Sequence, residues 1–153
     1  MKFAPRWRKA VLTAHVVTAV GWLGVDLVLL TFGVAGLSGA DPDLVYPAQS
    51  LVGRLLFVPL SVLVWLIGVV NAIGTPWGLL RHRWVLVKLV LTTVMLGLVL
   101  FLLYPGLVEA GAAAGALPRR DRVNLVVAPA VSTSLLLFAT VLSTYKPWGR
   151  LRR

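Results

Sequence analysis

The chain contains no cysteine and few acidic or histidine side chains. Five Asp and Glu residues stand against 15 Lys and Arg, with two histidines and two methionines. Without cysteine the protein forms no disulfide and carries neither a thiolate metal ligand nor a thiol nucleophile. The sequence also lacks paired carboxylates on one helix face, a Ser-His-acid set and a glycine-rich phosphate loop. These absences exclude the common hydrolase and nucleotide-binding classes.

Charged residues of either sign are scarce, and long apolar runs take their place. Hydrophobic residues make up 59% of the 153 residues, charged residues 13%, and the mean hydropathy is +0.91. Four apolar stretches cover residues 10–37, 51–74, 84–104 and 123–145. Each has the roughly 20 residues that a helix needs to cross about 30 Å of hydrocarbon. The sequence predicts one all-α transmembrane domain, residues 1–153, folded as a polytopic four-helix bundle.

Basic residues are concentrated on one side of the predicted spans. Ten lie before the first span, between the second and third, or after the fourth: Lys2, Arg6, Arg8, Lys9, Arg81, Arg83, Lys146, Arg150, Arg152 and Arg153. The positive-inside rule then places both termini in the cytoplasm of a multi-pass plasma (inner) membrane protein. We expect the basic ends to contact anionic lipid headgroups. Nucleic-acid binding is not expected, because no soluble segment is long enough to fold.

The tripeptide Pro-Trp-Gly occurs twice, at 76–78 and 147–149, each time at the end of an apolar run and before arginines. Proline ends a helix, and tryptophan favours the headgroup region, so the tripeptide is typical of an interfacial stop. Pro59 and Pro129 precede the two tripeptides at nearly the same offset. This echo predicts two helical hairpins related as a parallel internal repeat. Convergent interfacial signals are the alternative explanation.

Ionisable residues inside the predicted spans are the candidate functional residues, because each costs about 2.5–3.5 kcal/mol to insert. His15, Trp22 and Asp26 lie on one face of the first span at helical spacing. We expect Asp26 to form a structural ion pair with Arg54. A protonated Asp26, or one hydrated in a cavity, is the alternative.

His15 and Lys88 lie at similar predicted depths, just inside the cytoplasmic boundary of the first and third spans. Alone, Lys88 would be interpreted as a lysine that extends to the headgroups, and His15 as an interfacial histidine bonded to a neighbouring helix. If the two hairpins pack face to face, the two side chains share a site between spans one and three.

The motifs "VLTAHVVTAVGWLG", "GTPWGLLRHRWVLVK" and "LSTYKPWG" resemble a family of small predicted four-helix integral membrane proteins of unknown function. "AHVVTAVGWLG" is also similar to the first helix of the membrane protoporphyrinogen oxidase HemJ and of copper-resistance membrane proteins. The HemJ resemblance implies a functional pair at His15 and Lys88, the latter in "RWVLVK", and bound haem b. The further histidine-containing and aromatic motifs of the HemJ family are missing after the third span, where the chain reads "LVLTTVMLGLVLF".

A haem site would use His15 as the metal ligand, because a neutral imidazole binds iron. Arg81 and Arg83 would hold the propionates, Lys88 would lie beside the ligand, and Trp22 would pack on the macrocycle together with Met95. The second axial ligand stays open between Lys88, His82, Met95 and none. Copper is less favoured, since two methionines, two histidines and no cysteine supply few ligands for a soft metal.

Three functions follow from these observations. The preferred one is a non-catalytic accessory or assembly subunit of a larger membrane complex, or of a homo-oligomer. The alternative is a membrane oxidoreductase that handles haem b or porphyrin. The third is a small transporter with Asp26, Arg54 and Lys88 along its path. The sequence does not identify a substrate or a reaction.

Overall fold

The computed structural model describes residues 3–74 and 82–146. Four helical spans in these ranges are long and apolar enough to cross a membrane, which confirms a multi-pass, all-helical protein. Both Pro-Trp-Gly tripeptides and Arg81 lie outside the described residues. The elements are α1 (Pro5–Leu37), α2 (Pro42–Val52), the π-helical segment η1 (Gly53–Phe57), α3 (Val58–Gly74), α4 (Arg83–Leu98), the π-helical segment η2 (Val99–Leu103), α5 (Tyr104–Ala113), the 3₁₀ turn η3 (Ala114–Ala116) and α6 (Arg119–Tyr145).

The second and third helical spans are longer than the apolar stretches that predict them. The second begins at Pro42 rather than at residue 51, and the third runs to Ala116 rather than to residue 104. Asp41 caps the early start of α2 by accepting a hydrogen bond from the Asp43 backbone at 3.0 Å. The run of alanines at the end of the third span is less apolar than leucine but is a strong helix former. A prediction from hydropathy alone therefore underestimates the length of both helices.

Both π-helical segments end two residues before a proline, Pro59 or Pro105. Proline lacks the amide hydrogen of a helical bond, and its ring collides with the carbonyl four residues earlier. For Pro59 and Pro105 those carbonyls belong to Leu55 and Phe101, within η1 and η2. A wider π turn relieves this collision. In α6 the helix continues through Pro129 as an α-helix.

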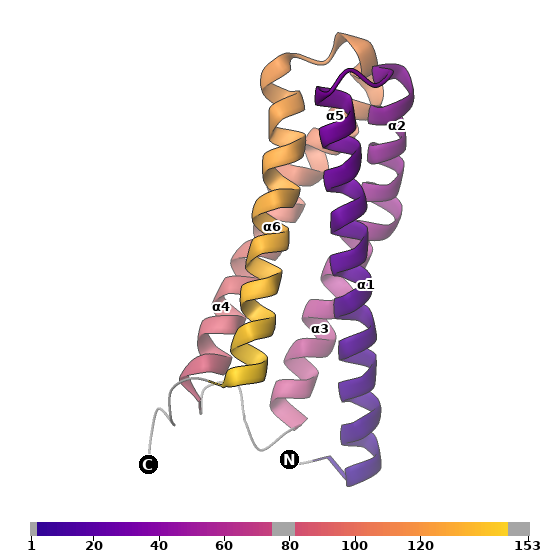
Figure 1. Cartoon of the computed structure of the whole chain (residues 1–153). Coiled ribbons are helices and arrows are strands. Elements are labelled where there is room, and N and C mark those ends of the chain that lie inside the picture. The colour runs from indigo at the N-terminus through magenta and orange to yellow at the C-terminus, as the bar shows by residue number, and fades with distance from the viewer. Residues whose placement is uncertain (1–2, 75–81, 147–153) are drawn as a thin grey trace.

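The four spans form an antiparallel bundle in which each packs on two neighbours (Figure 1). The first span, α1, lies against α3 and α6, and α4 also lies against α3 and α6. The first and third spans therefore face one another diagonally across the interior rather than side by side. The start of α1 and the end of α6 are at one end of the bundle (Figure 1), here called the terminal end. The opposite end, with the connections at 38–41 and 117–118, is the loop end.

Close helix contacts are concentrated toward the loop end. A Cβ atom added to Gly33 would lie 2.6 Å from the Leu125 carbonyl oxygen, and one added to Gly36 would lie 2.7 Å from the Tyr46 hydroxyl. These two glycines allow the neighbouring helices to approach closely. Gly24, by contrast, has nothing within 4 Å of its Cβ position. Figure 1 shows α1 and α6 close together here and separated toward the terminal end.

Gln49 of α2 joins three helices in this region. Its side chain is fully buried, and Nε2 donates to the carbonyl of Leu29 in α1 at 2.9 Å and to that of Leu125 in α6 at 3.1 Å. Residue 125 precedes Pro129 by four positions, so its carbonyl has no helical donor. Gln49 supplies the hydrogen bond that this proline removes.

Candidate functional site

The interior face of α1 carries the predicted polar residues in the predicted order. Trp22 is 3% exposed and Asp26 fully buried, and His15, nearer the terminal end, is half-buried. The helical spacing of the three residues therefore identified a true interior face. The role of this face depends on the residues of the other helices that contact it.

The carboxylate of Asp26 is bound by α6. One oxygen, Oδ2, accepts hydrogen bonds from the hydroxyl of Ser132 and, at 2.9 Å, from that of Thr133. The other oxygen, Oδ1, is buried without a hydrogen-bond partner. Arg54 is exposed on η1. The predicted ion pair between Asp26 and Arg54 is therefore wrong: two hydroxyls bind the carboxylate, and the guanidinium stays on the outside of the bundle.

The imidazole of His15 packs onto α3. Its Cε1 lies 3.0 Å from the position that a Cβ atom on Gly68 would take, so the ring would have to shift slightly to accommodate a larger residue there. The ring also approaches the backbone of Val64, one turn away on the same helix. Nδ1 is buried with no hydrogen-bond partner.

The ammonium group of Lys88 is directed to α6. Nζ donates to Ser143 Oγ at 2.8 Å, and Ser143 in turn donates to the Ala139 carbonyl at 2.9 Å. Lys88 is also near enough to His15 for an electrostatic interaction between the two side chains. The lysine is thus held inside the bundle instead of extending to the headgroups. A shared binding role for the two residues stays a prediction.

A haem between the expected residues does not fit this packing. Trp22 and Met95, which were expected to lie on the macrocycle, are each 3% exposed in the hydrophobic core, and the Trp22 ring is 5.8 Å from that of Phe57. A flat ring system has no slot between them. Arg83 is exposed at the start of α4. In the described ranges, no cluster of three or more histidine or acidic residues could hold a metal ion.

Several residues of this interior were not predicted from sequence. Ser132 and Ser143 of α6 bind Asp26 and Lys88, and Asn71 of α3 buries its Oδ1 without a hydrogen-bond partner. Thr133 donates to Asp26 as well. From sequence, the serines and threonine could have been found only as hydroxyl residues on a helix face that packs against an intramembrane charge.

Comparison with known proteins adds no relative. No family model, no curated protein and no solved structure matches the chain. The function is therefore inferred from the site and the surface of this protein alone.

Proposed function

We propose that this protein is a non-catalytic accessory or assembly subunit that docks beside a partner within the membrane. The observation that carries the proposal is a stripe of exposed threonine, valine and glycine on α1, in which Gly24 has nothing within 4 Å of its Cβ position. We call it the α1 outer face, and it consists of Thr13, Val17, Val20, Gly24, Val28 and Thr31, all exposed.

The composition of the α1 outer face is not explained by the fold of the single chain. A glycine in a helix interior is less stable than alanine by about 1 kcal/mol. Gly24 contacts nothing inside the protein that would require its small size. Small residues in membranes let a second helix approach closely enough for van der Waals packing. Packing of a partner helix against α1 would therefore explain why position 24 is glycine, which the packing within the single chain does not.

Exposed valines occur on α1, α4 and α6 alike, and larger side chains are exposed beside them. The exposed residues of α4 and η2 include Leu98, Phe101 and Leu102, and those of α6 include Leu137 and Phe138. Large flexible side chains of this kind suit contact with acyl chains. The docking proposal therefore rests on the stripe around Gly24 of α1, as the contact either for a larger complex or for a second copy of the chain.

The test is co-purification of tagged protein from its native membrane in mild detergent, with stoichiometry measured by native mass spectrometry. We expect one stoichiometric partner, lost in Gly24→Leu. The matched control is Gly97→Leu in α4, because Gly97 also has nothing within 4 Å of its Cβ position, and it should keep the partner. Wild-type protein that purifies alone, or a partner retained by Gly24→Leu, would contradict the proposal.

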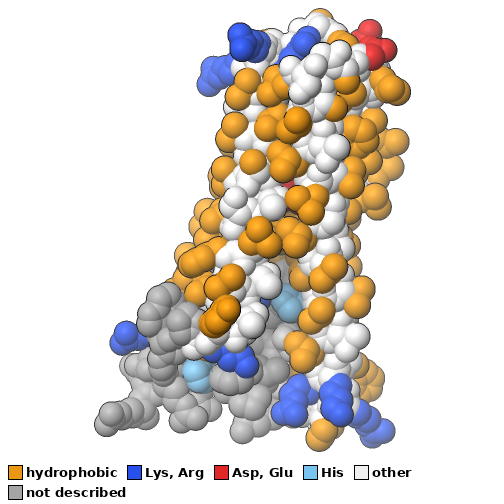
Figure 2. All heavy atoms as spheres, in the orientation of Figure 1, with side chains coloured by type: hydrophobic (Ala, Val, Ile, Leu, Met, Phe, Trp, Pro, Cys, Tyr) orange, Lys and Arg blue, Asp and Glu red, His pale blue; other side chains and the backbone are white. Residues whose placement is uncertain are grey.

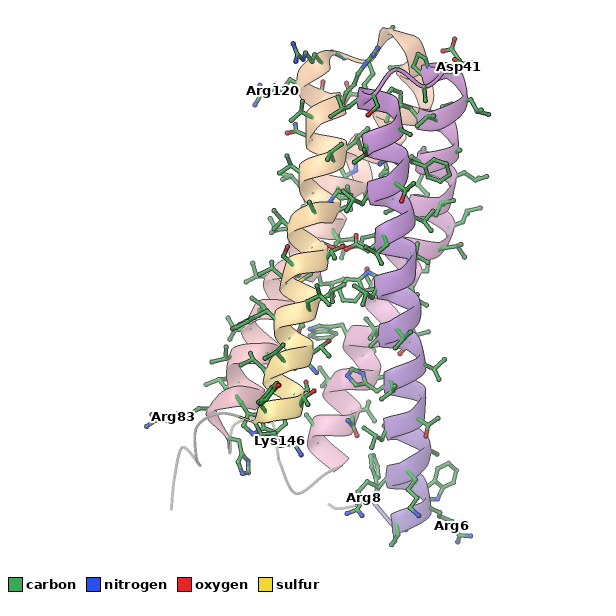
Figure 3. The ribbon with its side chains drawn as sticks, in the orientation of Figure 1. Arg6, Arg8, Asp41, Arg83, Arg120 and Lys146 are labelled. Carbon is green, nitrogen blue, oxygen red and sulfur yellow. The ribbon has the colours of Figure 1, made fainter. Side chains whose placement is uncertain are left out.

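The proposed orientation places the terminal end in the cytoplasm of the plasma membrane. Arg6, Arg8, Arg83 and Lys146 gather at this end, and Asp41 and Arg120 lie at the other (Figure 3). This distribution agrees with the positive-inside rule. The chain has no cysteine, so single-cysteine variants report topology cleanly. An impermeant maleimide should label Ser38→Cys in intact cells and Tyr145→Cys only after permeabilisation.

The other two expected functions have less support. Haem binding lacks its flanking residues, since Trp22 and Met95 belong to the packed core. A transport path through Arg54 lacks that residue, which is exposed. We expect no Soret absorption from protein purified out of haem-replete cells. A Soret band that disappears in His15→Ala would restore the haem function.

A further inference from the structure

Three side chains on the interior face of α1 each bury a polar atom that has no hydrogen-bond partner within the described residues. The atoms are His15 Nδ1, Trp22 Nε1 and Asp26 Oδ1. At 1.5 Å per residue they follow one another along the helix at intervals of about 10 Å and 6 Å. Buried polar atoms are normally satisfied by protein or by internal water. A line of three such atoms on one helix face therefore indicates a line of internal water.

The atoms of Trp22 and Asp26 are complementary to one water molecule. An indole N–H only donates, and a carboxylate oxygen only accepts. The two residues are four positions apart, so their side chains lie on the same face one turn apart. A water placed between them would accept from Nε1 with its oxygen and donate to Oδ1. A cation alone would not satisfy the indole.

We propose that Asp26 is a reversible proton-binding site, reached from the terminal end by water along this face of α1. Uptake forms an O–H bond at Oδ1 and breaks one O–H bond of a hydronium ion in the water line, and release reverses this. No electron is transferred. The inference does not depend on the docking function and is tested separately.

The surroundings of the carboxylate suit this role. Ser132 and Thr133 both donate to Oδ2, which leaves Oδ1 free to take the proton without breaking those bonds. An ionised carboxylate inside a membrane is costly unless it is neutralised. Nothing charged interacts with Asp26 in the part of the chain that the structure describes.

The charged groups of the packed helices all lie away from Asp26. Within the described ranges, α2 has only Asp43 in its first turn, where it accepts from the Gly115 amide, and α3 has no charged residue. α4 has only Arg83 and Lys88 near the terminal end, and α6 has its charges in its first turn, at 119–122. Arg54 of η1 is exposed on the outside of the bundle. A proton is thus the cation that can neutralise the carboxylate in place.

The route to Asp26 begins in the more open half of the bundle. α1 and α6 separate toward the terminal end (Figure 1), and Figure 2 shows the surface hollowed between them there, with the colour of histidine inside the hollow. His15, seven residues before Trp22 on the same face, is half-buried. Toward the loop end the same face continues as Leu29 and Gly33, which are closely packed.

The experiment is infrared difference spectroscopy of the full chain in lipid nanodiscs, between acidic and alkaline buffer. We expect a carbonyl-stretch band of a protonated carboxylic acid that is lost in Asp26→Asn. The amide oxygen of this variant can still accept from Ser132 and Thr133, so the variant should fold. The matched control is Asp41→Asn, which removes an exposed carboxyl group at the loop end and should leave this band in place.

Two further measurements separate the proposal from its alternatives. The band should shift in deuterated buffer within the time of mixing, and Trp22→Phe, which removes the indole donor, should slow that shift without abolishing the band. A band that does not respond to pH, or does not exchange, would show a dry structural residue and overturn the proposal. Loss of the band on adding sodium ions at constant pH would also overturn it, in favour of an alkali-cation site.

Discussion

The two halves of the bundle are built from similar residues but packed differently. Toward the loop end, glycines bring backbones into contact, and Gln49 joins three helices. At the same end, Asp43 Oδ1 accepts from the Gly115 amide at 2.9 Å, and Arg122 donates to the Leu117 carbonyl at 2.8 Å. Several polar groups there fix one helix on another, while Tyr46 Oη and Gln49 Oε1 are buried without a hydrogen-bond partner among the described residues.

Toward the terminal end, some polar groups are likewise unsatisfied. His15 and Asn71 bury atoms without hydrogen-bond partners, and Lys88 is held by a single serine. Polar atoms left unsatisfied inside a membrane reduce stability, so their presence points to a role other than packing. The two halves therefore differ more in how closely backbones approach at glycines than in whether buried polar atoms are satisfied. Substitutions of the same kind in the two halves should therefore have different effects.

The largest effect is expected from Gly33→Ala in the loop half. The new Cβ would lie 2.6 Å from the Leu125 carbonyl oxygen, and a backbone atom cannot turn away as a side chain can. Such overpacking costs about 1–3 kcal/mol of the free energy of unfolding. The measurement is unfolding in mild detergent titrated with a denaturing one. Gly24→Ala is the matched control on the same helix, and it should be neutral or slightly stabilising because nothing lies within 4 Å. Equal changes in the free energy of unfolding for Gly33→Ala and Gly24→Ala would show that the contact at Gly33 is not tighter than that at Gly24.

A smaller loss is expected for Gln49→Leu, which keeps the volume of the side chain. It removes the hydrogen bonds to Leu29 and Leu125, and leaving a buried carbonyl unpaired costs about 1–3 kcal/mol. Pro129→Ala should recover part of this loss, since an alanine amide can donate to the Leu125 carbonyl within α6. A double-mutant cycle measures the coupling. Strictly additive effects would show that Gln49 does not compensate for the proline.

Hydropathy predicted the four spans because each apolar run exceeds the membrane thickness. It missed the start of the second span at Pro42 and the end of the third at Ala116, because the helices continue there through less apolar residues. The helical period likewise predicted the interior face with His15, Trp22 and Asp26. The hairpin repeat and its cytoplasmic termini remain predictions.

The partner of Asp26 was not predictable, because the choice between Arg54 and α6 depends on how helices rotate in the bundle. Threonine adds to the difficulty. Thr18 and Thr31 donate to carbonyls of their own helix at 2.8 Å, whereas Thr133 donates to another. Nothing local distinguishes them, since the donor is the same and only the packed neighbour differs.

The smallest effect is expected from Gly68→Ala in the terminal half, the counterpart of Gly33→Ala. The new Cβ would lie 3.0 Å from His15 Cε1, which belongs to a side chain in the more open half. The imidazole can rotate toward the hollow, so the free energy of unfolding should change by less than about 1 kcal/mol, offset in part by the better helix propensity of alanine. Imidazole nitrogen NMR shifts should nevertheless move, because the ring leaves its site on α3. A loss as large as that of Gly33→Ala would mean that the terminal half is packed as rigidly as the loop half. The unsatisfied polar atoms along α1 would then need an explanation other than access to water.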